Sequence, residues 1–163
     1  MTHTGIGLGS NLGDRRDHLL QAARAIQALP VTDILQASSI WETPPWGKTD
    51  QPAFLNACLL VETSLTPNAL LSLILKIEQD MGREREEKWG PRLIDIDLLF
   101  MEDHHVVTDD LILPHPHISE RAFVLAPLKE IAPFQQIGTR SVLKLADEIS
   151  FEGLVKLGPF PPL

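Results

Sequence analysis

The chain has 163 residues with 44% hydrophobic and 22% charged side chains, the composition of an ordinary globular protein. Its 14 basic and 22 acidic residues give a net charge of −8, which disfavours a general nucleic-acid binder because such proteins are expected to be basic. A length within ~100–200 residues predicts a single domain over residues 1–163. The one cysteine, Cys58, excludes an internal disulfide framework and a multi-cysteine zinc site, and its apolar neighbours predict a buried side chain.

The N-terminal segment MTHTGIGLGS has neither the basic start nor the apolar stretch of a signal peptide. The longest apolar runs are the size of strands, far below the ~20 residues that cross a bilayer. We therefore expect a cytoplasmic protein without a membrane partner.

The first half of the chain predicts strands on both sides of a helix. Residues 4–9 form a short apolar strand pattern, and a helix is predicted over about residues 15–29. Residues 33–42 and 54–62 are rich in strand formers and are separated by the loop TPPWGKTDQP.

The second half begins with a clearly marked helix, which Thr66 caps and Pro67 opens. Residues 93–101 give the strongest strand pattern of the chain. A short strand pair around 105–107 and 111–113 follows, then a helix from about Ser119 that Pro127 disturbs. This order predicts an α+β sandwich, a split βαβ sheet with helices packed on one face and C-terminal additions.

The strand over residues 93–101 carries two acidic side chains. Asp95 and Asp97 are two residues apart, so both carboxylates point to one face of the strand. Neighbouring carboxylates flanked by apolar residues repel each other and lose hydration, so a cation is their natural partner. Oxygen ligands of this kind suit Mg²⁺, which keeps waters and takes phosphate oxygens. The alternative is a solvated face of an exposed sheet.

Basic residues precede this strand in the segment GREREEKWGPR. They are Arg83, Arg85, Lys88 and Arg92. Three glutamates lie among them, so a salt-bridged, solvated loop is one interpretation. The other is a phosphate-binding loop, because the segment leads through the turn Trp89-Gly90-Pro91 to the two aspartates, and arginines beside a metal are what phosphoryl transfer needs.

The segment LPHPH is followed by Arg121. His115 and His117 could form a metal pair, but a third soft ligand is missing nearby in the sequence, which disfavours zinc. We expect His115 and Arg121 to contact phosphate.

Phe54 and Asn56 share one face of their strand, and an aromatic ring beside an amide suits a flat heterocycle; ordinary sheet packing is the alternative. Gly5, Gly7 and Gly9 match neither a P-loop nor a dinucleotide-binding fingerprint.

Four segments together resemble the 6-hydroxymethyl-7,8-dihydropterin pyrophosphokinase family of folate biosynthesis: GLGSNLGD, TPPWGKTDQPAFLNA, GREREEKWGPRLIDIDLLF and LPHPHISERAFVLAPLKEIAP. The resemblance covers roughly residues 5–133. It implies a ferredoxin-like sandwich, a largely antiparallel sheet with helices packed on it. It also implies the transfer of pyrophosphate from ATP to the hydroxyl of the pterin, which gives AMP and the pterin diphosphate.

The resemblance further implies a role for individual residues. The ligands of two Mg²⁺ ions would be Asp95 and Asp97. The catalytic arginines of a closing loop would be Arg83 and Arg92. The remaining contacts to ATP would come from Trp89, His115 and Arg121. The pterin pocket would consist of Thr43, Pro44, Trp46, Phe54, Asn56 and Phe123, with the two phenylalanines on either side of the ring.

The sequence departs from the family pattern at Lys88, where arginine is common, and at Leu75, where a glutamine near the adenine can occur. Two other functions compete with a monomeric pyrophosphokinase. A binding module without activity would not need the full set of aspartates and arginines. A metal-dependent phosphodiesterase would need more His or Asp ligands than the sequence places near the two aspartates.

Overall fold

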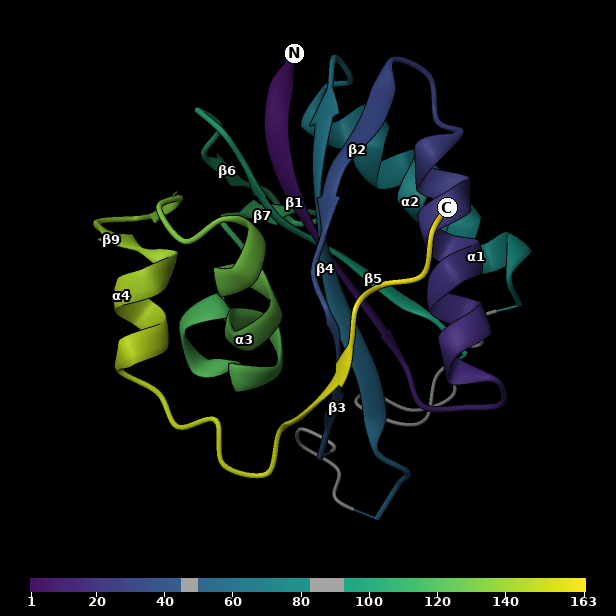
Figure 1. Ribbon diagram of the computed structural model, residues 1–163. Helices are drawn as coiled ribbons and strands as arrows, with labels where there is room; N and C mark the ends of the chain where they lie inside the picture. Colours follow the sequence, from purple (N-terminus) through teal and green to yellow (C-terminus); the bar gives the residue numbers. More distant parts are fainter. Residues whose placement is uncertain (45–49, 83–92) are drawn as a thin grey trace.

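The main sheet is built from strands that pair antiparallel (Figure 1). The computed structural model describes residues 1–44, 50–82 and 93–163. The strands of this sheet are β1 (Thr2–Ser10), β2 (Thr32–Ala37), β3 (Ile40–Thr43), β4 (Phe54–Thr63), β5 (Asp95–Met101) and β10 (Val155–Gly158). Their spatial order is β10-β3-β4-β1-β5, and β2 pairs with the other end of β4. The largely antiparallel α+β sheet predicted from the sequence is confirmed.

The strand predicted over residues 33–42 is interrupted at Ser38. The Ser38 backbone N–H donates to the carbonyl of Cys58, and its hydroxyl accepts the N–H of Cys58 at 2.8 Å. A side-chain oxygen thus takes the place of a backbone carbonyl in the ladder, and the strand divides into β2 and β3.

Helices cover both faces of the sheet. On one face lie α1 (Arg15–Gln27) and α2 (Pro67–Asp80), and on the other lie α3 (Ala122–Ile131) and α4 (Val142–Asp147) (Figure 1). The prediction that the helices pack on one face is therefore right for α1 and α2 and wrong for the later pair. None of the helices in the described residues is long and apolar enough to span a membrane.

The predicted helix cap at Thr66 is present, and one helix begins later in the sequence than predicted. Thr66 Oγ1 accepts the N–H of Ala69 at 3.2 Å, as expected for an N-cap. The helix predicted from Ser119 begins at Ala122 instead, because the 3-10 turn η1 (Ile118–Glu120) precedes it. Pro127 lies inside α3. The remaining short strands form two hairpins, β6 (Val106–Val107) with β7 (Ile112–Leu113) and β8 (Gln136–Ile137) with β9 (Arg140–Ser141).

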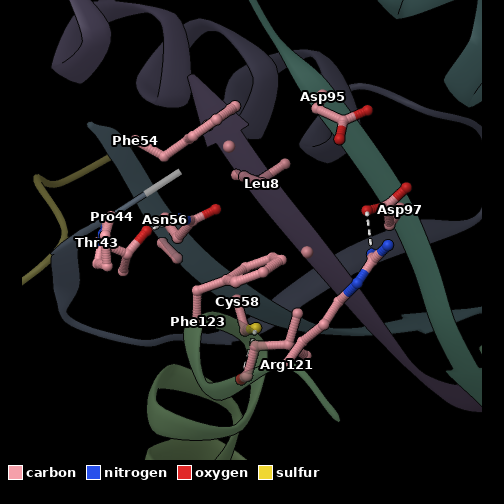
Figure 2. Close-up of a pocket in the computed structure, with 14 residues that line it drawn as sticks. Leu8, Thr43, Pro44, Phe54, Asn56, Cys58, Asp95, Asp97, Arg121 and Phe123 are labelled. Carbon is pink, nitrogen blue, oxygen red and sulfur yellow. Dashed lines mark hydrogen bonds and ion pairs between the residues drawn. The ribbon is translucent and has the colours of Figure 1, made fainter. Parts of the chain in front are cut away.

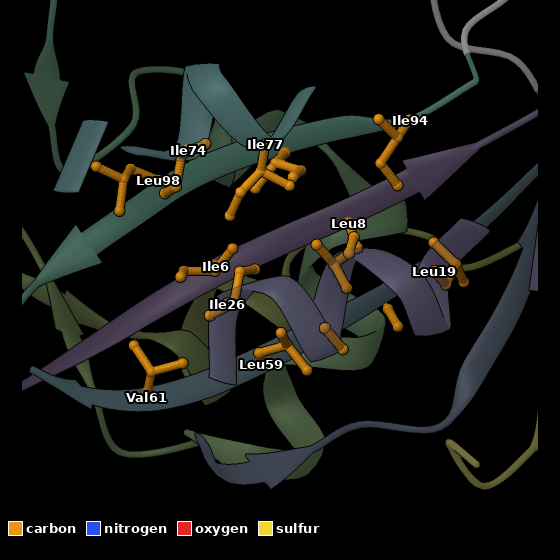
Figure 3. Close-up of a cluster of buried hydrophobic side chains, with 14 of the residues drawn as sticks. Ile6, Leu8, Leu19, Ile26, Leu59, Val61, Ile74, Ile77, Ile94 and Leu98 are labelled. Atoms are coloured by element: carbon orange, nitrogen blue, oxygen red, sulfur yellow. The ribbon is translucent and has the colours of Figure 1, made fainter. Parts of the chain in front are cut away.

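Each face of the sheet has its own hydrophobic core. The core under α1 and α2 includes Ile6, Leu59 and Leu98 from the strands (Figure 3). The core under α3 and α4 includes Cys58 and Phe100. Because successive strand residues point to opposite faces, the same strands supply both cores. The burial predicted for Cys58 is confirmed, since its exposed fraction is 1%.

Two glycines of β1 differ in the space around them, and this difference predicts different tolerance to alanine. A Cβ at Gly5 would lie 2.3 Å from Cε1 of the buried Phe100 ring, whereas a Cβ at Gly7 would lie 3.5 Å from Leu99 Cδ2. We expect Gly5→Ala to lower the free energy of unfolding by about 1–3 kcal/mol through overpacking. Gly7→Ala, the matched control, should cost less in the same urea titration; equal losses would contradict the packing argument.

Candidate active site

A row of glycines on β1 forms the floor of a pocket on the α3 side of the sheet. Gly7 lies opposite Asp97 of β5, and Gly9 lies opposite Asn56 of β4 and Asp95 of β5. Paired residues of antiparallel strands point to the same face, so the glycines leave an open space between the amide and the two carboxylates. A Cβ at Gly9 would lie 2.7 Å from Asn56 Oδ1, so a larger residue would displace this amide.

The two aspartates of β5 form one side of the pocket (Figure 2). Both are half-buried, and Ile94, Ile96 and Leu98, which alternate with them, are buried in the opposite core. The sequence prediction that the carboxylates share a face is thus confirmed, and both line a pocket while remaining partly exposed. The described residues contain no group of three or more His, Cys, Asp or Glu side chains that could hold a metal ion. Two carboxylates open to solvent fit Mg²⁺, which completes its shell with water and phosphate oxygens.

Arg121 connects the acidic side of the pocket to its aromatic side. Its side chain is 6% exposed and its Nη1 lies 4.0 Å from Asp97 Oδ2 (Figure 2). Its guanidinium lies 5.5 Å from the centroid of the Phe123 ring, within the range of a cation–π contact. Burial lowers the pKa of Arg121, and the charges of Asp97 and Asp95 oppose this shift. The pocket therefore holds a buried positive charge beside the two carboxylates.

The other side of the pocket consists of two aromatic rings and the side-chain amide of Asn56. Figure 2 shows Phe54 and Phe123 on different sides of the space, with Asn56 pointing between them. Asn56 Nδ2 donates to the buried hydroxyl of Thr43 at 2.7 Å, which orients the amide so that Oδ1 faces Gly9. A planar heterocycle could stack on the rings and donate a hydrogen bond to this oxygen.

The structure brings most of the predicted site residues together. Those that line the pocket are Thr43, Pro44, Phe54, Asn56, Asp95, Asp97, Arg121 and Phe123. His115 lines a separate hollow with Pro114 and Pro116 instead. Trp46, Arg83, Trp89 and Arg92 lie outside the described residues, as do Arg85 and Lys88.

His115 accepts a hydrogen bond at Nδ1 from the backbone N–H of His117, at 3.1 Å. Burial lowers the pKa of His115 to about 4, with smaller contributions from Arg121 and His117. The ring is therefore neutral near pH 7 and carries its proton on Nε2, where it can act as a donor. His117 contacts Glu120 at 2.9 Å. Among the described residues, no third ligand joins the two histidines, so the zinc alternative gains no support.

The pocket also has lining residues that the sequence did not predict as site residues: Gly7, Leu8, Gly9, Ala57, Cys58 and Val124. Gly7 and Gly9 fall within the strand predicted over residues 4–9, and their alternation with Leu8 is the sequence signal for a strand face without side chains. Cys58 also lines the pocket, and burial raises the pKa of its thiol far above the usual value, with Asp97 and Glu130 adding to the shift. The thiol is therefore protonated and is not an activated nucleophile.

Comparison with known proteins gives one consistent family. The sequence model of the 7,8-dihydro-6-hydroxymethylpterin-pyrophosphokinase (HPPK) family matches residues 5–133. The chain is 46% identical over 159 residues to the 2-amino-4-hydroxy-6-hydroxymethyldihydropteridine pyrophosphokinase of Methylorubrum extorquens, covering 98% of this chain and 96% of that protein. It is 47% identical over 126 residues to the protein of the same name from Bacillus subtilis, covering 77% and 75% of the two chains.

Solved structures agree on the fold. The crystal structure of wild-type Plasmodium falciparum HPPK-DHPS with pteroate matches with a TM-score of 0.71 at 17% identity. The match covers 90% of this chain and 42% of the other, so this chain spans less than half of that protein.

The pKa of His115 predicts how stability changes with pH. Because the folded value of about 4 lies below the ordinary 6.5, the unfolded chain binds more protons between these values, and stability falls as the pH drops from 6.5 to 4. We expect His115→Asn, which places an oxygen near the Nδ1 position and does not titrate, to remove on the order of 1–2 kcal/mol of this loss, a figure reduced for the partial exposure of the ring. Urea unfolding of both proteins from pH 4 to 7 measures it; parallel profiles would contradict the assignment.

Proposed function

The chain belongs to the 7,8-dihydro-6-hydroxymethylpterin-pyrophosphokinase family, whose activity is the ATP-dependent pyrophosphokinase step of folate biosynthesis, and we propose that the pocket on the α3 side of the sheet is where this transfer occurs. One observation carries the proposal. A single pocket has two aromatic rings and an oriented amide on one side and a pair of carboxylates on the other. This arrangement suits a flat pterin whose hydroxymethyl group reaches toward metal-bound phosphates.

Asp95 and Asp97 would hold Mg²⁺, with two ions expected between the protein and the phosphates of ATP. When bound, Mg²⁺ neutralises the charge of the phosphate oxygens. These residues fit Mg²⁺ because both carboxylates point to the same face of β5. The paired residues on β1 are glycines, which leave space for the ion.

In the proposed reaction the hydroxyl oxygen of the pterin forms a bond to the β-phosphorus of ATP. The bond from this phosphorus to the oxygen that bridges to the α-phosphate breaks, AMP leaves with the electron pair, and the hydroxyl proton passes to water. Such transfers depend mostly on positioning and on stabilisation of charge, so the protein's main task is to hold donor and acceptor in line.

The aromatic side would bind the pterin. Phe54 and Phe123 would stack on the ring, while Asn56 Oδ1 accepts from its N–H groups and Thr43 keeps the amide in this orientation. Pro44 would line the pocket beside Thr43, and Trp46 would add an apolar contact to the pterin. A ring that cannot donate to Asn56 would leave a buried oxygen unpaired, which gives selectivity.

The remaining residues would bind the nucleotide. Arg121 would contact phosphate from its buried position beside Asp97, and neutral His115 would donate from Nε2 to a phosphate or the ribose. Arg83 and Arg92 would stabilise charge on the phosphates, and Trp89 would cover the nucleotide. We propose further that residues 1–163 act as one monomeric domain in the cytoplasm.

The decisive experiment is the release of AMP from ATP with Mg²⁺, measured with and without 6-hydroxymethyl-7,8-dihydropterin. A pyrophosphokinase forms AMP and the pterin diphosphate in equal amounts and only when both substrates are present. Release of AMP without the pterin would indicate a phosphodiesterase. Binding of both ligands without release would indicate a binding module.

Phe123 provides a test of the pterin side. We expect Phe123→Ala to weaken pterin binding about tenfold or more, because a stacked ring contributes about 0.5–1.5 kcal/mol beyond its burial. ATP binding should change much less in the same calorimetric titrations. Phe151→Ala is the control, since Phe151 also packs against the α3 core but does not line the pocket. Equal losses for both ligands would indicate general destabilisation.

Arg92 provides a test of the transfer step. It precedes Asp95 by three residues in the sequence. If it stabilises charge that develops on the leaving oxygen, Arg92→Ala should lower kcat on the order of 10²–10³-fold and change the Kd for ATP far less. Arg85→Ala, further from the strand and among glutamates, should have a small effect on both. A parallel change in kcat and Kd would make Arg92 a ground-state phosphate ligand instead.

A further inference from the structure

A buried acid on α2 contacts the backbone between the two aspartates. Glu78 is 3% exposed, and its Oε2 accepts the N–H of Ile96 at 2.8 Å. Burial of a carboxylate is costly unless hydrogen bonds compensate for its lost hydration, so this contact is a specific feature of the packing of α2 on β5.

The contact lies on the outer edge of the sheet. β5 is the last strand beside β1, so the backbone groups on its other side need acceptors and donors from elsewhere. Glu78 supplies an acceptor to Ile96, and the backbone N–H of His115 donates to the carbonyl of Leu99 at 2.7 Å. Of these two contacts, the one to Ile96 lies between the two aspartates, and the one to Leu99 lies two residues beyond Asp97.

We propose that Glu78 is a positioning residue for the metal ligands of this enzyme, acting through the Ile96 amide; the inference rests on the proposed function of the pocket. Ile96 is the residue between Asp95 and Asp97, so fixing its peptide group limits the directions of both carboxylates. Hydrogen-bond partners behind metal ligands are known to affect affinity in this way. Glu78, Asp95 and Asp97 do not form a group that could hold one ion between them, which separates positioning from ligation.

Two substitutions separate the effect of the Glu78 charge from the effect of its side-chain length. Glu78→Gln keeps an oxygen at the same distance from the helix and removes the charge. Glu78→Asp keeps the charge but withdraws the carboxylate by one methylene. If the hydrogen bond matters, the glutamine variant should resemble the wild type and the aspartate variant should not.

The chain offers a matched control on α1. Gln27 Oε1 accepts the N–H of Ile34 on β2 at 2.9 Å, the same kind of contact on a strand outside the pocket. Gln27→Ala should lower the free energy of unfolding and speed hydrogen exchange of the Ile34 amide. It should not change Mn²⁺ binding at Asp95 and Asp97.

The experiment uses the full chain and two readouts that need no turnover. The first is hydrogen exchange of the Ile96 amide by NMR without metal. The second is the Kd for Mn²⁺, measured by electron paramagnetic resonance with a non-hydrolysable ATP analogue. For Glu78→Asp we expect exchange at least about tenfold faster and a Kd for Mn²⁺ raised about 10–100-fold. For Glu78→Gln both should stay within about threefold of the wild type.

Two results would overturn the proposal. One is a Glu78→Asp variant that binds Mn²⁺ as well as Gln27→Ala does. The other is a Glu78→Gln variant with slow Ile96 exchange but weak Mn²⁺ binding, which would assign the effect to charge. Failure of the proposed function would be seen separately, as absence of AMP formation by the wild type.

Discussion

The register of β1 against its two neighbours is the constraint on which the site depends. Gly9 faces Asn56 on one side and Asp95 on the other, and Gly7 faces Asp97. Glycines of β1 therefore lie between the Asn56 amide and the two carboxylates. The amide would bind a heterocycle and the carboxylates would hold a metal, with no side chain of β1 between them. A shift of one residue on β5 would send the carboxylates into the hydrophobic core, so the burial of the alternate residues enforces the register.

The same alternation joins stability to function on β5. Ile96 and Leu98 are buried against α1 and α2, while Asp95 and Asp97, which alternate with them, face the pocket. One face of β5 packs on the core under α1 and α2. One edge of β5 pairs with β1, and the other edge is hydrogen-bonded by Glu78 and by the backbone of His115. Two carboxylates fixed in three directions would need little rearrangement to bind a cation, which is the advantage of placing such residues on a strand rather than a loop.

Local features of the sequence predicted local features of the structure. The cap follows from the residue types Thr66 and Pro67, the shared face of Asp95 and Asp97 follows from their spacing, and both are confirmed. The gathering of distant residues in one pocket was predicted only through the family resemblance, and individual contacts between distant residues were not predicted. The contact of Arg121 with Asp97 requires α3 to lie on the face of the sheet opposite α1. The sequence pattern predicted all helices on one face. Likewise Glu78 has no local signal, because only the packing of α2 against an edge strand makes it a partner of Ile96.

The C-terminal residues show how a site can depend on a segment outside its recognisable motifs. The family match ends at residue 133, yet β10 pairs with β3, the four-residue strand that ends at Thr43. Glu130 strengthens this junction, since it accepts the Trp41 indole N–H at 2.8 Å and lies 3.7 Å from Lys156 of β10. Without β10, a strand this short would be an edge and would hold Thr43, and through it the Asn56 amide, less firmly. The aromatic side of the pocket is thus stabilised by β10, which lies outside the segments that carry the family resemblance.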